Sequence, residues 1–185
     1  QIIYIIEIQT NQQFSMLSLE SKKILLGITG GIAAYKIPIL VRLLVKAGAD
    51  VKVILTESAK EFVSPLTLQV LSNNSVFSSF TNEDHDNPEW NNHVDLGNWA
   101  DIYLIAPATS NSLSSMANAI CNNLLIATYL SASCPILIAP AMDLDMYSHP
   151  ATKKNIKKLS SYGNIIFPVG EGFLASGLHG KGRIC

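Results

Sequence analysis

Four apolar runs of the sequence are each followed by a segment that could border a ligand. Three of these four segments consist mainly of small or hydroxyl-bearing residues, the types that bind anions in α/β proteins. These segments are residues 29–31 (T-G-G), 56–58 (T-E-S), 107–112 (P-A-T-S-N-S) and 140–143 (P-A-M-D). Where such residues begin a helix, their backbone amides and hydroxyl groups can approach a phosphate closely. We therefore predict a cofactor that carries a phosphate. The glycine turn is neither G-x-G-x-x-G nor a P-loop, and a tight turn without a ligand is its alternative interpretation.

The elements that must position these segments alternate between β-rich runs and helical stretches. Expected strands cover residues 24–29, 51–55, 102–106, 136–139 and 164–167, and expected helices cover 32–47, 65–71, 110–118, 123–131 and 151–161. Short, continuously apolar strands separated by helices are typical of a parallel sheet with helices on both faces. Ligands bind beyond the carboxyl ends of such strands, which is where the four segments would meet.

Composition excludes several classes of protein. Of 185 residues, 48% are apolar and only 15% are charged, which fits one domain with a large core and favours association with other subunits. The net charge of −1 and the absence of a basic stripe argue against a nucleic-acid binder. Three widely spaced cysteines form neither a disulfide framework nor a zinc cluster, and no apolar stretch could span a membrane. We expect a reduced, cytoplasmic protein.

The two ends of the chain differ from its centre. We interpret residues 1–20 as an N-terminal extension that is not native to the domain, with Met16 as the natural start and an added edge strand as the alternative. The segment lacks the basic region and cleavage site of a signal peptide. Residues 21–185 form the functional domain, which we interpret as truncated in or after its last loop. Residues 81–92 form an irregular insertion.

Six segments carry a family resemblance. They are residues 27–36 (G-I-T-G-G-I-A-A-Y-K), 55–59 (L-T-E-S-A), 92–101 (N-H-V-D-L-G-N-W-A-D), 106–113 (A-P-A-T-S-N-S-L), 139–147 (A-P-A-M-D-L-D-M-Y) and 174–183 (L-A-S-G-L-H-G-K-G-R). Together they resemble the flavin-dependent cysteine decarboxylases, in particular the phosphopantothenoylcysteine decarboxylase domain of the bifunctional bacterial coenzyme A biosynthesis flavoprotein. One segment is modest support, whereas six in order at the family's spacing are strong support.

The resemblance implies a fold, a cofactor and an assembly. The fold would be flavodoxin-like (Rossmann-like), a doubly wound parallel sheet in three α/β/α layers, and the cofactor would be FMN. The protein would form homotrimers, or a dodecamer built from trimers, with FMN at the subunit interface. The residues implied to bind FMN are Gly30, Gly31, Ile32, Thr56, Ser58, Thr109, Ser110, Asn111, Ser112 and Ala141.

The implied reaction is decarboxylation of 4′-phosphopantothenoylcysteine to 4′-phosphopantetheine in coenzyme A biosynthesis. A saturated cysteine carboxylate cannot hold the electrons left when carbon dioxide departs. Oxidation of the thiol to a thioaldehyde creates the missing electron sink, and the enethiolate left after decarboxylation is then reduced again. The protein would be a carboxy-lyase, and the full-length protein would also contain a phosphopantothenate–cysteine ligase.

The resemblance also implies the residues that act on the substrate. His93 falls on the family's active-site histidine, and Ser176 stands at the position of its proton-donating cysteine. Asp143, Met146, Ala175 and Gly177 would bind the substrate. Without the resemblance, His93 would be interpreted as a surface residue after an Asn-rich loop. His85 lies in a solvated acidic loop rather than at a metal, so we predict no metal site.

Two positions depart from the family pattern. Asp143 replaces the asparagine that binds the substrate carboxylate, and two carboxylates repel unless one is protonated or a cation intervenes. Ser176 replaces the cysteine, and an alkyl hydroxyl is a much weaker acid than a thiol with a pKa of about 8.5.

Three functions agree with these departures. The favoured one is the same decarboxylation with other groups assisting, for which His179 and Lys181 are candidates. The second is an oxidative decarboxylase that acts on peptidyl cysteine and releases an enethiol. The third is an FMN-binding regulatory protein without turnover.

Overall fold

The computed structural model describes residues 18–82, 89–177 and 179–184. Residues 1–17 of the expected N-terminal extension, with Met16 and the alternative edge strand, therefore lie outside the described residues. The same holds for the centre of the insertion, residues 83–88, which includes His85.

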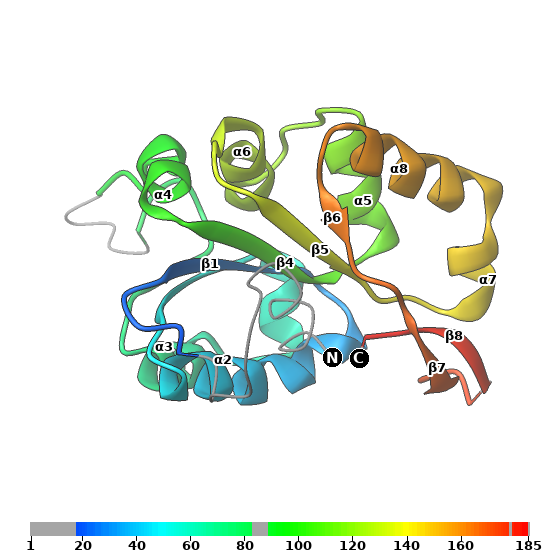
Figure 1. The fold of residues 1–185 in the computed structure, drawn as a ribbon, viewed down its shortest axis with the longest axis horizontal. Coiled ribbons are helices and arrows are strands. Elements are labelled where there is room, and N and C mark those ends of the chain that lie inside the picture. The colour runs from blue at the N-terminus through cyan, green and yellow to red at the C-terminus, as the bar shows by residue number, and fades with distance from the viewer. Residues whose placement is uncertain (1–17, 83–88, 178, 185) are drawn as a thin grey trace.

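A six-stranded parallel sheet forms the centre of the molecule (Figure 1). Its strands are β1 (Lys23–Ile28), β2 (Asp50–Leu55), β3 (Val76–Phe77), β4 (Ile102–Ala108), β5 (Ile136–Pro140) and β6 (Ile165–Ile166), in the order β3-β2-β1-β4-β5-β6. Apart from the two-residue edge strand β3, this is the 2-1-3-4-5 order of flavodoxin-like sheets. The order reverses between β1 and β4, and a crevice opens at the carboxyl ends of these two strands.

Helices cover both faces of the sheet, which gives the three layers expected (Figure 1). The helices α2 (Ile37–Lys46) and α3 (Pro65–Ser72) cover one face. The other face carries α4 (His93–Trp99), α5 (Ser110–Ala117), α6 (Leu124–Ser131) and α8 (Pro150–Ser161). In the described ranges no helix is both long and apolar enough to cross a bilayer.

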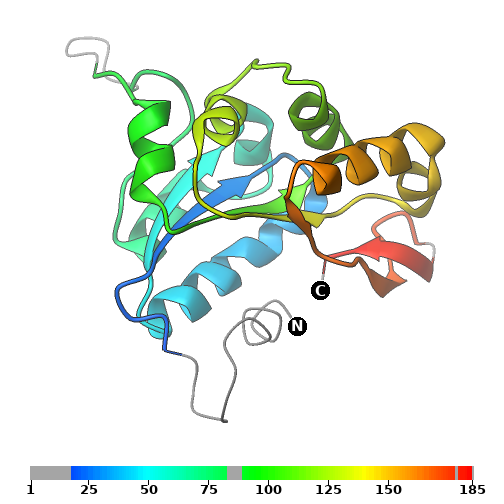
Figure 2. The same ribbon diagram turned by 45° about the horizontal axis from the view of Figure 1, so that its top comes forward.

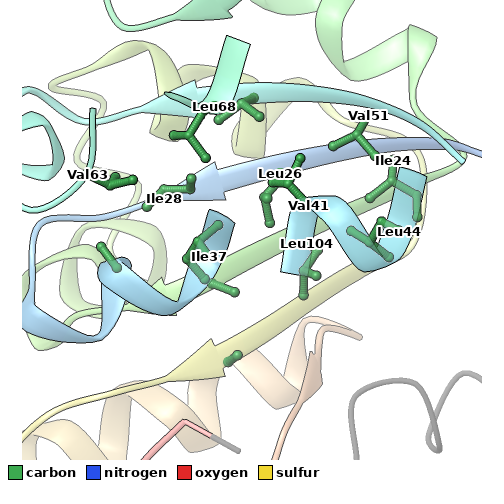
Figure 3. Packing of buried hydrophobic residues seen from close by; sticks show 14 of the residues in the cluster. Ile24, Leu26, Ile28, Ile37, Val41, Leu44, Val51, Val63, Leu68 and Leu104 are labelled. Atoms are coloured by element: carbon green, nitrogen blue, oxygen red, sulfur yellow. The ribbon is translucent and has the colours of Figure 1, made fainter. Parts of the chain in front are cut away.

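The core explains why the strands are continuously apolar. In β1, Ile24, Leu26 and Ile28 pack against α2 on one face (Figure 3), whereas Leu25 belongs to the cluster on the other face with Tyr103. Successive side chains of a strand point to opposite faces, so a sheet covered on both sides needs apolar residues at every position.

One expected helix is divided into two elements. Residues 32–47 form a 3₁₀ helix, η1 (Ile32–Lys36), followed by α2, whose first turn contains Pro38. Proline has no N–H to donate to the preceding turn and fits best at a helix start, so it separates the two. A second 3₁₀ helix, η2 (Glu57–Glu61), follows β2.

Other elements were not expected from the sequence. They are α4, the short helix α7 (Leu144–Ser148), the strand β3, and the antiparallel hairpin β7 (Gly170–Phe173) with β8 (His179–Arg183). Glycine lowers both helix and strand propensity, and it occurs within α4 and both hairpin strands. We call residues 170–183 the flap. It lies beside the ends of β5 and β6 (Figure 2).

Candidate active site

A cavity of about 1060 Å³ lies at the carboxyl ends of β1, β2, β4 and β5 and is bordered by the flap. This volume suits a cofactor together with a small substrate. Its lining includes every residue that the resemblance implies for FMN: Gly30, Gly31, Ile32, Thr56, Ser58, Thr109, Ser110, Asn111, Ser112 and Ala141. The lining also includes Asp143, Met146, Ala175 and Ser176, but not Gly177. The four segments singled out in the sequence therefore meet at one site.

A close backbone approach shapes the cavity between β1 and β2. A Cβ atom at Gly30 would lie 2.3 Å from Ser58 Oγ and 2.7 Å from the backbone carbon of Ser58. Because the backbone cannot move aside, only glycine fits there. The hydroxyls of Thr56 and Ser58 are 3.3 Å apart, so two hydroxyls border the same turn. Glycine and hydroxyl groups at the starts of helical turns are what an anionic group needs.

A threonine bridge fixes the crevice between β1 and β4. The Thr29 hydroxyl donates to the Pro107 carbonyl at 2.7 Å and accepts from the Thr109 amide at 3.0 Å. Thr109 in turn caps α5, where its hydroxyl accepts from the Ser112 amide at 3.4 Å. These bonds hold the start of α5 against the end of β1, and so they position residues 109–112 at the cavity.

Backbone contacts dock the flap on the segment after β5. The Met142 amide donates to the Gly182 carbonyl at 3.1 Å. A Cβ atom at Gly182 would lie 2.2 Å from the Met142 carbonyl oxygen. Gly182 also has a φ of +150°, a backbone conformation that residues other than glycine rarely adopt. Gly180 packs on Leu144, since an added Cβ would lie 3.1 Å from its side chain. Glycine therefore permits the docked position.

Asp143 connects the flap to α7. Its Oδ1 accepts from the Leu144 amide at 2.8 Å, as a helix cap, and from the Ser176 hydroxyl at 3.0 Å. The two residues that depart from the family pattern are therefore in direct contact, although 33 positions separate them in the sequence.

His93 lies outside the cavity within one chain. It begins α4, where Asn92 caps the helix by accepting from the Val94 amide at 3.0 Å. Its ring meets Phe80 and Trp90 edge to face, each with ring centroids 6.2 Å apart. Its Nδ1 is buried and has no hydrogen-bond partner among the described residues. In Figures 1 and 2, α4 and the flap lie on opposite sides of the molecule.

Several cavity residues were not identified from the sequence as site residues. Lys36, Asn122 and Arg183 line the cavity, and the Lys36 ammonium donates to the Ile184 carbonyl at 3.2 Å. Asn123, which also lines it, caps α6 by accepting from the Ile126 amide at 2.9 Å. An asparagine at the start of an apolar helix is a capping signal that could have indicated this position.

Residues with shifted pKa values lie elsewhere. Burial raises the pKa of Tyr103 well above its usual value, and the Tyr103 hydroxyl donates to the Leu125 carbonyl at 3.1 Å. Burial likewise raises the pKa values of Tyr129 and Cys134. None of the three lines the cavity: Tyr103 and Tyr129 are buried in the core, and Cys134 is partly buried against it. His179 packs on Phe173, and neither His179 nor Lys181 lines the cavity.

The sheet order and the cavity at its switch point define a flavodoxin-like ligand-binding protein. The chain belongs to the Flavoprotein family, whose family model matches residues 14–184. The family predicted from the six segments is thereby confirmed.

Two relatives and one solved structure place the chain within this family. It is 47% identical over 166 residues to the coenzyme A biosynthesis bifunctional protein CoaBC of Bacillus subtilis (strain 168). The aligned region covers 90% of this chain and 40% of the relative. It is 55% identical over 122 residues to a cysteine/cysteine sulfinic acid decarboxylase of an unknown prokaryotic organism. This match covers 66% of this chain and 33% of the relative. The chain therefore spans less than half the length of these curated relatives.

The solved structure is a PPC decarboxylase variant with a cysteine-to-serine substitution, complexed with pantothenoylaminoethenethiol. The TM-score is 0.78 at 28% identity, over 90% of this chain and 92% of that one. The flavodoxin-like fold class is confirmed by this match.

Proposed function

We propose that this chain binds FMN and decarboxylates 4′-phosphopantothenoylcysteine to 4′-phosphopantetheine. The observation that carries the proposal is that the implied FMN residues, from four strand ends, line one cavity together with Asp143, Met146 and Ser176. The coenzyme A biosynthesis relatives and the PPC decarboxylase structure support this substrate. Because the proposed reaction belongs to coenzyme A biosynthesis, we also propose a small-molecule substrate and a cytoplasmic location.

The cavity suits FMN. The turn at Gly30 and Gly31, with the hydroxyl of Ser58, would hold the phosphate. Residues 109–112 and Ala141 would hold the rest of the flavin, since they line the same cavity. When bound, FMN supplies a reversible two-electron acceptor for the thiol-bearing carbon, which allows the neighbouring carboxylate to leave.

The residues of the chain would orient the substrate and move protons. The docked flap borders the cavity and places Ser176 in its lining, where the substrate would bind. A neutral imidazole can accept the thiol proton, which is the role we propose for His93. Because His93 lies outside the cavity of its own chain, this role needs a neighbouring copy.

We propose a homotrimer, alone or as the unit of a dodecamer, in which His93 of one copy reaches the FMN cavity of the next. Ile32, Tyr35, Ile39 and Leu43 form an apolar stripe along η1 and α2, and each is between 45% and 63% exposed. Such a stripe is typical of a subunit interface. It begins at the cavity, which Ile32 and Tyr35 also line, so a neighbouring copy on this stripe would sit at the cavity mouth.

Mass spectrometry of the product tests the proposed function. The FMN-loaded protein, given 4′-phosphopantothenoylcysteine, should release carbon dioxide and 4′-phosphopantetheine. A protein that cannot be loaded with FMN would contradict the cofactor assignment. A protein that holds FMN but leaves the substrate intact would instead be an FMN-binding regulatory protein.

A second candidate function is oxidative decarboxylation that stops at the enethiol. Two observations favour it. Ser176 carries a hydroxyl at the proton donor's position, and this hydroxyl is already bonded to Asp143. The solved cysteine-to-serine variant of PPC decarboxylase holds an ethenethiol compound. The product in this case would be two hydrogens lighter than 4′-phosphopantetheine.

Replacing Ser176 by cysteine should increase the formation of 4′-phosphopantetheine by about tenfold or more, because a thiol is a far stronger acid than a hydroxyl. The ratio of reduced product to enethiol, measured by mass spectrometry, reports the change. Ser148→Cys adds a thiol at an exposed position of α7 outside the cavity and serves as the control. An unchanged ratio in Ser176→Cys would show that residue 176 is not the proton donor.

A further inference from the structure

One carboxylate in the cavity has an unused oxygen. The two hydrogen bonds to Asp143, from the Leu144 amide and the Ser176 hydroxyl, both go to Oδ1. Its Oδ2 accepts no hydrogen bond from the described residues, and no Lys, Arg or His among them forms an ion pair with it. The cap and the flap contact hold Oδ1 toward the protein. Oδ2 is therefore the atom available to a ligand in the cavity.

The chemistry of a carboxylate restricts which substrate group can meet Oδ2. An ionised carboxylate only accepts hydrogen bonds, so it needs a donor. A second carboxylate at this place would be repelled. In a cysteine derivative, the carbon that carries the departing carboxylate also carries a nitrogen. That nitrogen is a donor, as an amide N–H in N-acylated cysteine and as an ammonium in free cysteine.

We propose that Asp143 binds the α-nitrogen of the substrate and that the site consequently accepts a second substrate class, cysteine with a free α-ammonium group. This inference rests on the proposed decarboxylation. With an N-acylated substrate the Asp143 carboxylate would accept a hydrogen bond from a neutral amide N–H. With free cysteine it would instead pair with an ammonium, so that both partners are charged. The departing carboxylate would then point away from Asp143.

The net reaction with free cysteine is balanced without an external oxidant. The bond between the α-carbon and the carboxylate breaks, carbon dioxide leaves, and a proton from solvent takes its place on carbon. The product is cysteamine. The two electrons removed from the thiol-bearing carbon before decarboxylation return to it afterwards, so the flavin ends in its starting state.

Binding of two unreactive ligands to the FMN-loaded protein tests the contact itself. S-methyl-L-cysteine carries the ammonium, and N-acetyl-S-methyl-L-cysteine carries an amide instead. Replacing Asp143 by asparagine should shift the ratio of their dissociation constants by about tenfold in favour of the acetylated ligand. Asp145→Asn removes the same charge from an exposed position outside the cavity and should leave the ratio unchanged. Equal ratios in the wild type and Asp143→Asn would overturn the assignment.

Turnover separates this inference from the proposed function. Wild-type protein should convert L-cysteine to cysteamine, detected by mass spectrometry, as well as 4′-phosphopantothenoylcysteine to 4′-phosphopantetheine. If the acylated substrate reacts and cysteine does not, the second substrate class is wrong. If neither substrate reacts but the binding ratio shifts as expected, the proposed decarboxylation fails and the contact between Asp143 and the α-nitrogen stands.

Discussion

Replacing His93 by asparagine should lower the rate of decarboxylation by about 10²- to 10⁴-fold while FMN stays bound, because a positioned acid or base contributes about that much to a rate. Asparagine keeps the size and a donor but cannot take up a proton near neutral pH. The measurement is product formation under saturating substrate, with flavin content determined by absorbance in parallel. Full activity in His93→Asn would contradict the catalytic role. Loss of flavin along with activity would indicate a structural role instead.

Mixing two inactive variants tests whether His93 acts in a neighbouring copy. His93→Asn retains an intact flap, and Gly182→Ala retains His93. When equal amounts are dissociated and reassembled, about one quarter of the sites should combine an intact flap with a neighbour's His93, by random assortment in a closed ring. Activity should therefore return toward one quarter of the wild-type value. No recovery in mixed oligomers would show that His93 does not serve a neighbour's cavity.

The second large effect concerns the docked flap. Replacing Gly182 by alanine should lower kcat/KM by about 10²-fold, the cost of a displacement of about 1 Å among positioned groups. The added Cβ would lie 2.2 Å from the Met142 carbonyl oxygen, so the flap and that segment must move apart. Ser176 would then lose its place beside Asp143. Steady-state kinetics, together with limited proteolysis of the flap, would measure the change.

A matched control separates flap displacement from general strain. Gly163 also has a positive φ, of +90°, yet an added Cβ there would meet nothing within 4 Å. Gly163→Ala should cost about 1–2 kcal/mol of stability from backbone strain and leave kcat/KM unchanged. If Gly182→Ala retained wild-type kcat/KM, the docked flap would not be needed for activity.

Much of the fold follows from local patterns in the sequence. Every expected strand was found within two residues of its ends, and the one at 164–167 is shortened to Ile165–Ile166. Strands buried on both faces carry unbroken apolar runs, which stand out against helical periodicity. The short helices α4 and α7 and the glycine-rich flap were missed, because their local propensities are weak and tertiary contacts stabilise them.

The sequence by itself determined that the four segments after the apolar runs meet at one edge of a parallel sheet. This follows because successive parallel strands must end at the same edge, whatever the distance between them in the chain. Only the tertiary structure decided that His93 lies outside the cavity of its own chain, and that Asp143 contacts Ser176. Both depend on how separate elements pack, which no short-range periodicity encodes. The acidic residue after β5 is therefore not an isolated substitution, since the flap residue that bonds to it departs from the family pattern as well.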